Sequence, residues 1–271
     1  MSARVITDNQ TLFNAYHELQ AGDIVVGRIR LRPGEESLLV DLVSRGVHLI
    51  PSATAQLCSR SKVLQAGLLG AFMGPGTHPV YDLHDMLRLV GEYGNEDRVI
   101  CKLDRANGGT GILCFSSIED VYNQAVLGVL AFPFVVQPFY ADCRDIRVVV
   151  LGELLEAYER RNSRNFRHNL HCGGVSRPWR LTKAQHRLCR QVMRRAGFPY
   201  AHIDFLVSPD GETWLTEINL RGGLKGALLN QKDYLAQVKR IHGELVEGLQ
   251  KQGQTAEREG SGREKKRKAE K

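Results

Sequence analysis

The chain has 271 residues, of which 42% are hydrophobic and 25% are charged, and its net charge is +7. This ordinary globular composition excludes collagen-like and wholly disordered chains. No apolar run reaches the roughly 18 residues that a membrane-spanning helix needs, and the start MSARVITDNQ lacks the apolar core of a signal peptide. The six cysteines are scattered, with no CxxC pair, so we expect reduced thiols and a cytoplasmic protein.

The first sixty residues predict a strand, a helix and a second strand. DIVVGRIRL is apolar enough for a strand, SLLVDLVSR carries apolar residues at helical spacing, and GVHLIPS begins at a glycine that ends the helix. A βαβ unit over roughly residues 20–52 is short for an independent domain. We therefore expect residues 1–60 to form a short lobe and residues 61–250 to form the main domain.

A glycine-rich loop follows two predicted helices, which lie around residues 53–69 and from about residue 82. RVICKLD, RANGGTG and ILCFSS predict a strand, a loop and a second strand. Because the loop joins two strands, neither the Walker pattern nor the dinucleotide fingerprint fits. Its backbone N–H groups can still approach phosphate oxygens closely, with Lys102 as a point charge. A plain hairpin turn is the alternative interpretation.

Positive charge gathers in two segments. Residues 144–195 carry +9 and residues 251–271 carry +4, so the rest of the chain sums to −6. The tail cluster GREKKRKAEK lacks an apolar face, and we expect a disordered basic extension over 251–271. The internal cluster favours an anionic ligand, since guanidinium groups pair bidentately with phosphate and carboxylate. Asp145, Arg147 and Arg160 can share one face of a predicted hairpin there; a surface hairpin with cross-strand ion pairs is the alternative.

A second hairpin, AHIDFLVSPDGETWLTEINLRGG, has a PDGE turn between two apolar arms. Glu217 and Asn219 are two residues apart on the second arm, so both project from one face. Asp204 lies on the first arm, where antiparallel pairing can bring it alongside them. Three oxygen-bearing side chains on one face predict a magnesium site, because Mg²⁺ prefers hard oxygen ligands.

The order of these motifs resembles the ATP-grasp enzymes, and most nearly the RimK-like carboxylate-amine ligases, which add glutamate to a protein or cofactor. The matching features are Lys62, Lys102 with its glycine flap, the hinge VQPF, DIR, ERR, FRHNLHCGG, AHIDF and EIN, spread over about residues 20–250. The resemblance implies a mixed α/β (α+β) chain, in which an ATP-grasp fold follows a short N-terminal βαβ pre-grasp lobe.

The resemblance also implies which residues bind ATP. The two lysines and the flap glycines would hold the phosphates, the hinge backbone would bind the adenine edge, and Asp145 would contact the ribose. The residues are Lys62, Lys102, Gly108, Gly109, Gly111, Gln137, Phe139 and Asp145.

The remaining roles implied by the resemblance concern the reacting groups. Arg147 and Arg160, as catalytic residues, would face the γ-phosphate and the acyl group together with Arg167 and Asn169. Magnesium, or manganese in its place, would be held by Asp204, Glu217 and Asn219. The implied reaction has two steps: a carboxylate attacks the γ-phosphate to give an acyl phosphate, and an amine then displaces phosphate to form an amide.

The segment after the metal residues departs from the family. The usual Pro-Gly is replaced by Leu220, Arg221, Gly222 and Gly223, and Lys225 stands where an acid is usual. The family's usual substrate therefore does not transfer automatically to this chain, although we expect an acidic small molecule, peptide or protein. A homo-oligomer remains open, whereas a membrane or nucleic-acid partner is not expected.

Two other classes of function fit parts of the sequence. An ATP-grasp fold can serve as a kinase or as a nucleotide-binding partner without ligase activity, because fold does not determine function. A polyanion-binding protein would use the basic helix and the tail. It would leave the two acids and the amide of the predicted metal site unexplained.

Overall fold

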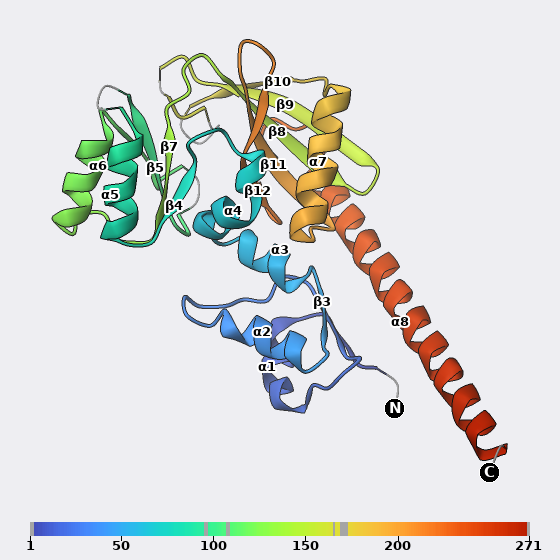
Figure 1. The fold of residues 1–271 in the computed structure, drawn as a ribbon. Helices are drawn as coiled ribbons and strands as arrows, with labels where there is room; N and C mark the ends of the chain where they lie inside the picture. The colour runs from blue at the N-terminus through green and yellow to red at the C-terminus, as the bar shows by residue number, and fades with distance from the viewer. Residues whose placement is uncertain (1–2, 95–96, 107–108, 165, 169–172, 270–271) are drawn as a thin grey trace. The chain divides into compact units, whose positions relative to one another are not determined.

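The computed structural model describes residues 3–94, 97–106, 109–164, 166–168 and 173–269 (Figure 1). The chain divides into two compact units. One contains residues 1–53 and 232–271, and the other contains residues 54–231. Among the described residues, no helix combines the length and the apolar character that crossing a membrane requires.

The first unit contains a three-stranded parallel sheet. Its strands are β1 (Val5–Ile6), β2 (Ile24–Val26) and β3 (His48–Ile50), in the order β1-β2-β3, with helices α1 (Asn9–Asn14) and α2 (Ser37–Ser44). The predicted strand–helix–strand unit is β2, α2 and β3, and β1 and α1 precede it. Asp8 caps α1 by accepting a hydrogen bond from the Thr11 N–H at 2.8 Å.

The long helix α8 (Gln231–Ala269) belongs to this unit from Lys232 onward. Tyr234 and Ile241, which are seven residues apart, are buried on one face of it. The helix continues through residues for which composition predicts a disordered tail. Its final segment is rich in lysine, arginine, glutamate and glutamine, which have high helix propensity, and no proline interrupts it.

The second unit contains two antiparallel sheets. The smaller has the order β4-β7-β5-β6, and helices α5 (Leu83–Glu92) and α6 (Ile118–Val126) cover it (Figure 1). Its strands are β4 (His78–Val80), β5 (Val99–Leu103), β6 (Ile112–Phe115) and β7 (Phe134–Pro138). Val99, Ile118 and Phe134 are fully buried between the helices and the sheet. The predicted strand, glycine loop and strand are β5, residues 104–111 and β6.

The larger sheet has five strands in the order β10-β9-β8-β11-β12. They are β8 (Arg144–Leu151), β9 (Leu154–Arg161), β10 (Val175–Pro178), β11 (Tyr200–Val207) and β12 (Thr213–Asn219). Helix α7 (Lys183–Ala196) packs against β11 and buries Cys189, Val192 and Ala196. Thr182 and Gln185 form a capping box at its start, and Gly197 ends it in the left-handed conformation.

Two short helices precede the smaller sheet, α3 (Ala53–Cys58) and α4 (Lys62–Leu69), and α4 contacts strands of both sheets. The buried side chain of Gln65 determines this placement. Its amide donates to the Ile218 carbonyl at 3.0 Å, and its oxygen accepts from the Ile218 N–H at 2.9 Å. These bonds hold the start of α4 close to β12.

Gly111 closes the loop between β5 and β6, where its carbonyl accepts from the Leu103 N–H at 2.8 Å. A methyl group there would overlap the Cβ of Ala106, so the loop would have to move. We expect Gly111→Ala to lower the free energy of unfolding by about 1–3 kcal/mol in urea denaturation. Gly91→Ala, at an open position of α5, is the control and should raise it by up to about 1 kcal/mol. A Gly111→Ala chain as stable as the wild type would contradict this packing.

Candidate active site

One row of side chains crosses four strands of the larger sheet. Arg147 on β8 lies opposite Tyr158 on β9 and opposite Asp204 on β11, and Asp204 in turn lies opposite Glu217 on β12. Directly opposite residues in antiparallel strands project from the same face. The hairpin that was predicted to bring Asp204 alongside Glu217 therefore does so.

The rows on either side carry further polar groups on this face. Asp145 lies opposite Arg160, and His202 lies opposite Asn219. The predicted arginines, acids and amide of β8, β9, β11 and β12 thus lie within three successive rows. Glycine is required beside this face at position 222, because a Cβ there would overlap the ring of His202.

Four of these side chains form a buried ion cluster. Arg147 binds Asp204 with both ends of its guanidinium, Nε to Oδ1 at 2.7 Å and Nη2 to Oδ2 at 2.6 Å. Arg160 contacts Asp145 at 2.5 Å and Asp204 at 3.1 Å through its Nη2. Asp145, which the family resemblance places against a ribose, is therefore paired with Arg160 in this structure.

The two aspartates of the cluster shift in opposite directions. Burial disfavours the charge of Asp204, but the guanidiniums of Arg147 and Arg160 outweigh it and hold its pKa well below the usual range. Burial raises the pKa of Asp145, and the single close partner Arg160, opposed by the charge of Asp204, offsets this only in part. Asp204 is thus the carboxylate that stays ionised over the whole ordinary pH range.

The two predicted lysines approach this face from outside the larger sheet. Lys62 is the first residue of α4, and Ser61 caps that helix by accepting from the Leu64 N–H at 3.0 Å. The buried Lys62 ammonium donates to the Ala106 carbonyl and lies 3.8 Å from Glu217. Lys102 projects from β5, and its Nζ lies 3.4 Å from the Thr216 carbonyl next to Glu217. Both cations therefore meet the acidic end of the row.

Burial lowers the pKa of Lys102 to about 8, although the charge of Glu217 partly opposes the shift. Its folded-state pKa therefore lies below that of the unfolded chain, so stability should rise with pH between about 8 and 10.5. We expect NMR titration of ¹⁵N-labelled lysine side chains to show one ammonium titrating near pH 8. Lys102→Arg should remove that resonance, and a titration above pH 10 would contradict the burial of this amine.

The glycine flap is described in part. Gly109 has φ +82°, a conformation that favours glycine, whereas Gly108 lies outside the described residues. Arg167 donates from Nε to the Ile112 carbonyl at 3.1 Å, so it binds the strand that leaves the flap. Asn169 also lies outside the described residues. In this structure Arg167 thus contacts the flap strand, and its predicted place facing the γ-phosphate stays a prediction.

The hinge backbone is partly engaged in strand pairing. Gln137 is buried in β7 opposite Ile100, and the Phe139 N–H donates to the Arg98 carbonyl at 2.9 Å. The Arg98 guanidinium lies 4.1 Å from the centre of the Phe139 ring. Pairing beside the strand that begins at Val99 therefore uses the Phe139 N–H, and adenine binding by the rest of the hinge backbone stays a prediction.

Sequence reasoning missed two groups close to this site. Tyr140 packs on Trp214, with ring centroids 4.8 Å apart, and its hydroxyl donates to the Pro75 carbonyl. This contact connects the hinge to β12. Tyr158 lies in the row of Arg147, and its only signal in the sequence is its place two residues before Arg160 in the AYERR run.

The proposed metal ligands fit a hard divalent cation. Two carboxylates and an amide oxygen share one face, which is the donor set that Mg²⁺ prefers. Arginine donors use three of the roughly four acceptor positions of the Asp204 carboxylate. Among the described residues, no group of three or more histidine, cysteine, aspartate or glutamate side chains is arranged to hold a metal ion. A cation here would thus depend on Asn219 as well as on the two acids.

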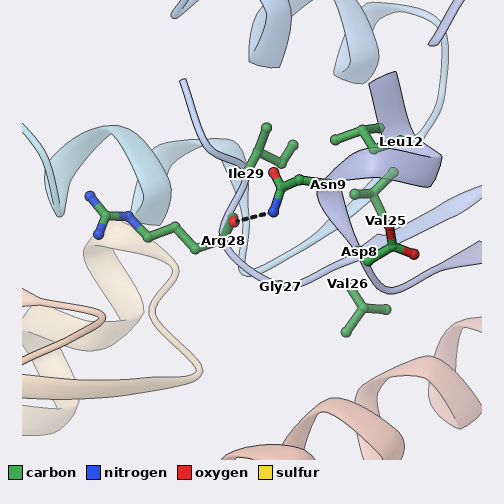
Figure 2. A pocket seen from close by; sticks show the side chains of 8 residues that line it. All are labelled: Asp8, Asn9, Leu12, Val25, Val26, Gly27, Arg28 and Ile29. Carbon is green, nitrogen blue, oxygen red and sulfur yellow. Dashed lines mark hydrogen bonds between the residues drawn. The ribbon is translucent and has the colours of Figure 1, made fainter. Parts of the chain in front are cut away.

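The first unit has a small pocket, which is too small to be a second candidate active site. Asp8, Asn9, Leu12 and residues 25–29 line it (Figure 2), and it holds about 10 Å³ of space. One water molecule needs at least that much. The Asn9 side chain accepts from the Arg30 N–H at 2.7 Å and donates to the Arg28 carbonyl at 3.4 Å. The polar atoms of the Asn9 side chain therefore hold the loop after β2 in place.

Comparison with known proteins shows the family of this chain. Residues 75–238 match the RimK-like ATP-grasp domain. A probable alpha-L-glutamate ligase of Cellvibrio japonicus (strain Ueda107) is 27% identical over 226 residues, which are 77% of this chain and 72% of that protein. The glutathione synthetase of Agrobacterium fabrum (strain C58 / ATCC 33970) is 29% identical over 54% of this chain, which spans only 46% of that relative.

A solved structure shares the fold. The D-alanine-D-alanine ligase from Coxiella burnetii superimposes with a TM-score of 0.57 at 15% identity, covering 88% of this chain and 73% of that one. At this identity the likeness concerns the fold alone.

Proposed function

Since the chain belongs to the RimK-like ATP-grasp family of carboxylate-amine ligases, we propose that it joins an amino acid, glutamate first among the candidates, to an acidic peptide, protein or cofactor. The observation that carries this proposal is the meeting of Lys62 and Lys102 with the row of Arg147, Asp204 and Glu217. Cations and acids from two sheets and a helix converge there. ATP and a divalent metal are the ligands that such a constellation suits.

The proposed reaction needs positive charge more than a nucleophilic side chain. An oxygen of the substrate carboxylate attacks the γ-phosphorus, and the bond between that phosphorus and the oxygen that bridges it to the β-phosphate breaks. The products are ADP and an acyl phosphate. An amine then attacks the acyl carbon, loses a proton and expels phosphate. The first step brings two anions together and the second expels an anionic phosphate, so Arg147, Arg160, Lys62 and Lys102 would act by positioning and by neutralising charge.

Asp204, Glu217 and Asn219 are the residues proposed to hold Mg²⁺, or Mn²⁺ in its place. When bound, such an ion would neutralise phosphate charge. The cations of the site would order the phosphates and the carboxylate. We further propose that the flap with Gly109 and Gly111 excludes water, which would otherwise hydrolyse the acyl phosphate.

An acidic substrate class is supported by the positive charge of the segment that carries the site arginines. Residues 144–195 carry a net +9 in a chain whose total is +7. The loop after Asn219, which follows the metal residues, adds Arg221 and Lys225 with no acid between them. A cleft with excess positive charge concentrates anionic substrates and repels cationic ones. A cytoplasmic location, a boundary near residue 60 and any oligomeric state remain predictions.

Hydroxylamine trapping tests the function directly. Purified protein is incubated with ATP, MgCl₂, hydroxylamine and one carboxylate at a time, including glutamate and glutamate-terminated peptides. Hydroxamate and ADP are then measured together. Equal amounts of both are expected for the true carboxylate, because hydroxylamine intercepts the acyl phosphate. ADP without hydroxamate would instead indicate a kinase or an idle ATPase, and neither product across the whole panel would contradict the ligase proposal.

A further inference from the structure

Tyr158 combines complete burial with an unsatisfied polar group. Its side chain is 1% exposed, and its hydroxyl has no hydrogen-bond partner among the described residues. Buried polar side-chain atoms in folded proteins are nearly always paired, since an unpaired one destabilises the fold. A phenylalanine would fill the same volume without that cost. The hydroxyl of Tyr158 therefore needs an explanation other than packing.

The neighbours of this tyrosine are the charged groups of the proposed active site. Tyr158 lies directly opposite Arg147 on the neighbouring strand, and Glu156 and Arg160 flank it on the same face of β9. Burial raises the pKa of its hydroxyl, so the group is neutral and protonated at neutral pH. A neutral hydroxyl beside a guanidinium is suited to accept a hydrogen bond through its oxygen.

In this structure Asp204 orients the Arg147 guanidinium, because it accepts from two of its five N–H donors. Its Nε and Nη2 bind the two oxygens of Asp204 at 2.7 and 2.6 Å. On the proposed function, on which this inference rests, a divalent metal competes for the same carboxylate oxygens. Metal coordination would therefore weaken the hydrogen bonds by which the Asp204 carboxylate now orients Arg147. The guanidinium would then need a second hydrogen-bond acceptor.

We propose that Tyr158 is a positioning residue, whose hydroxyl oxygen accepts a hydrogen bond from Arg147 once a metal ion occupies Asp204. The exchange keeps the guanidinium on the face where the phosphates bind. It also explains why an unpaired hydroxyl is retained, because the Arg147 guanidinium, now oriented by Asp204, would turn toward it only in the loaded state. The residue acts through Arg147 and does not itself contact the reacting atoms.

Tyr158→Phe separates this role from a purely structural one. In the ligand-free protein, removing an unpaired buried hydroxyl should raise the melting temperature by about 2–4 °C. Calorimetric titration with the β,γ-imido analogue of ATP in MgCl₂ should show affinity weakened by about tenfold, the loss expected for one charged hydrogen bond. In EDTA the variant and the wild type should bind the analogue equally, because Asp204 then still orients Arg147.

Tyr93→Phe is the matched control. The Tyr93 hydroxyl donates to the Gly76 carbonyl, so its removal should lower the melting temperature and leave the magnesium-dependent affinity unchanged. The proposal is overturned if Tyr158→Phe binds the analogue like the wild type in MgCl₂, if it loses the same affinity in EDTA, or if its melting temperature falls. A wild-type chain that binds no analogue at all would overturn the proposed function itself, so the two failures are distinguishable.

Discussion

Glu217→Gln is expected to reduce ATP turnover on the order of 10³-fold, because the stabilisation that a metal ion gives to phosphoryl transfer is worth several kcal/mol. The substitution keeps the shape of the side chain and removes the charge that a divalent cation requires. Lys62 lies 3.8 Å away, and the Glu217 side chain is 26% exposed. The free energy of unfolding should therefore change by less than about 1 kcal/mol.

The measurement is ADP release with the carboxylate identified by hydroxylamine trapping, together with urea denaturation of both proteins. Glu212→Gln is the control, since Glu212 is an exposed acid in the turn of the same hairpin. It should turn over ATP at the wild-type rate. Normal turnover in Glu217→Gln would remove Glu217 from the proposed metal site. A large loss of stability would mean that the lost turnover comes from unfolding and not from a missing metal ligand.

Asp204→Ala should cause the largest loss of stability of any substitution considered. It leaves the Arg147 and Arg160 guanidiniums, which are 17% and 6% exposed, without their shared acceptor. Removing one partner of a buried ion pair costs about 3–5 kcal/mol, since the remaining charge is uncompensated. Urea denaturation at pH 7 measures this loss. Turnover should disappear as well, because the same carboxylate is proposed to bind the metal.

Glu159→Ala is the matched control for Asp204→Ala. Glu159 is also buried and pairs with Arg177 at 2.5 Å, but the Arg177 side chain is 61% exposed and can return to water. Glu159→Ala should therefore lower the free energy of unfolding by clearly less than Asp204→Ala. Equal losses in the two variants would contradict the idea that two trapped guanidiniums cause the difference.

The pH dependence of stability should differ between the wild type and Asp204→Ala. The folded-state pKa of Asp204 lies below its unfolded value of about 3.8, so its contribution is complete above that value and is lost as the pH falls toward the folded pKa. Asp145 has a raised pKa and contributes with the opposite sign. Wild-type protein should thus lose more stability below pH 4 than Asp204→Ala does.

Local patterns were sufficient to predict several elements of the second unit. The strands on either side of the glycine loop are β5 and β6, and the PDGE turn joins β11 to β12. A turn fixes the register of the strands beside it, and alternation determines which side chains share a face. Asp204, Glu217 and Asn219 could therefore be placed on one face from sequence alone, although their roles remain proposals.

Contacts between distant segments followed no local pattern. Lys102 lies beside the Thr216 carbonyl across 114 positions, and Gln65 binds Ile218 across 153. Both contacts depend on how β5, α4 and β12 pack. The occupied N–H of Phe139 depends likewise on the pairing of β7 with β5. Periodicity describes which face of an element is apolar and carries no information about which element covers it.

The sequence by itself determined the family of this chain, the order of its motifs and the residue types that can bind phosphate and metal, because these depend on composition and on spacing within one hairpin or loop. Only the tertiary structure decided that Arg147 and Arg160 share Asp204, that Asp145 pairs with Arg160, and that Tyr158 lies buried and unpaired beside them. Those facts depend on β8 lying between β9 and β11. The physical reason is that strand order and burial arise from the packing of the whole sheet, and burial is what turns a charged side chain into one that must find a partner.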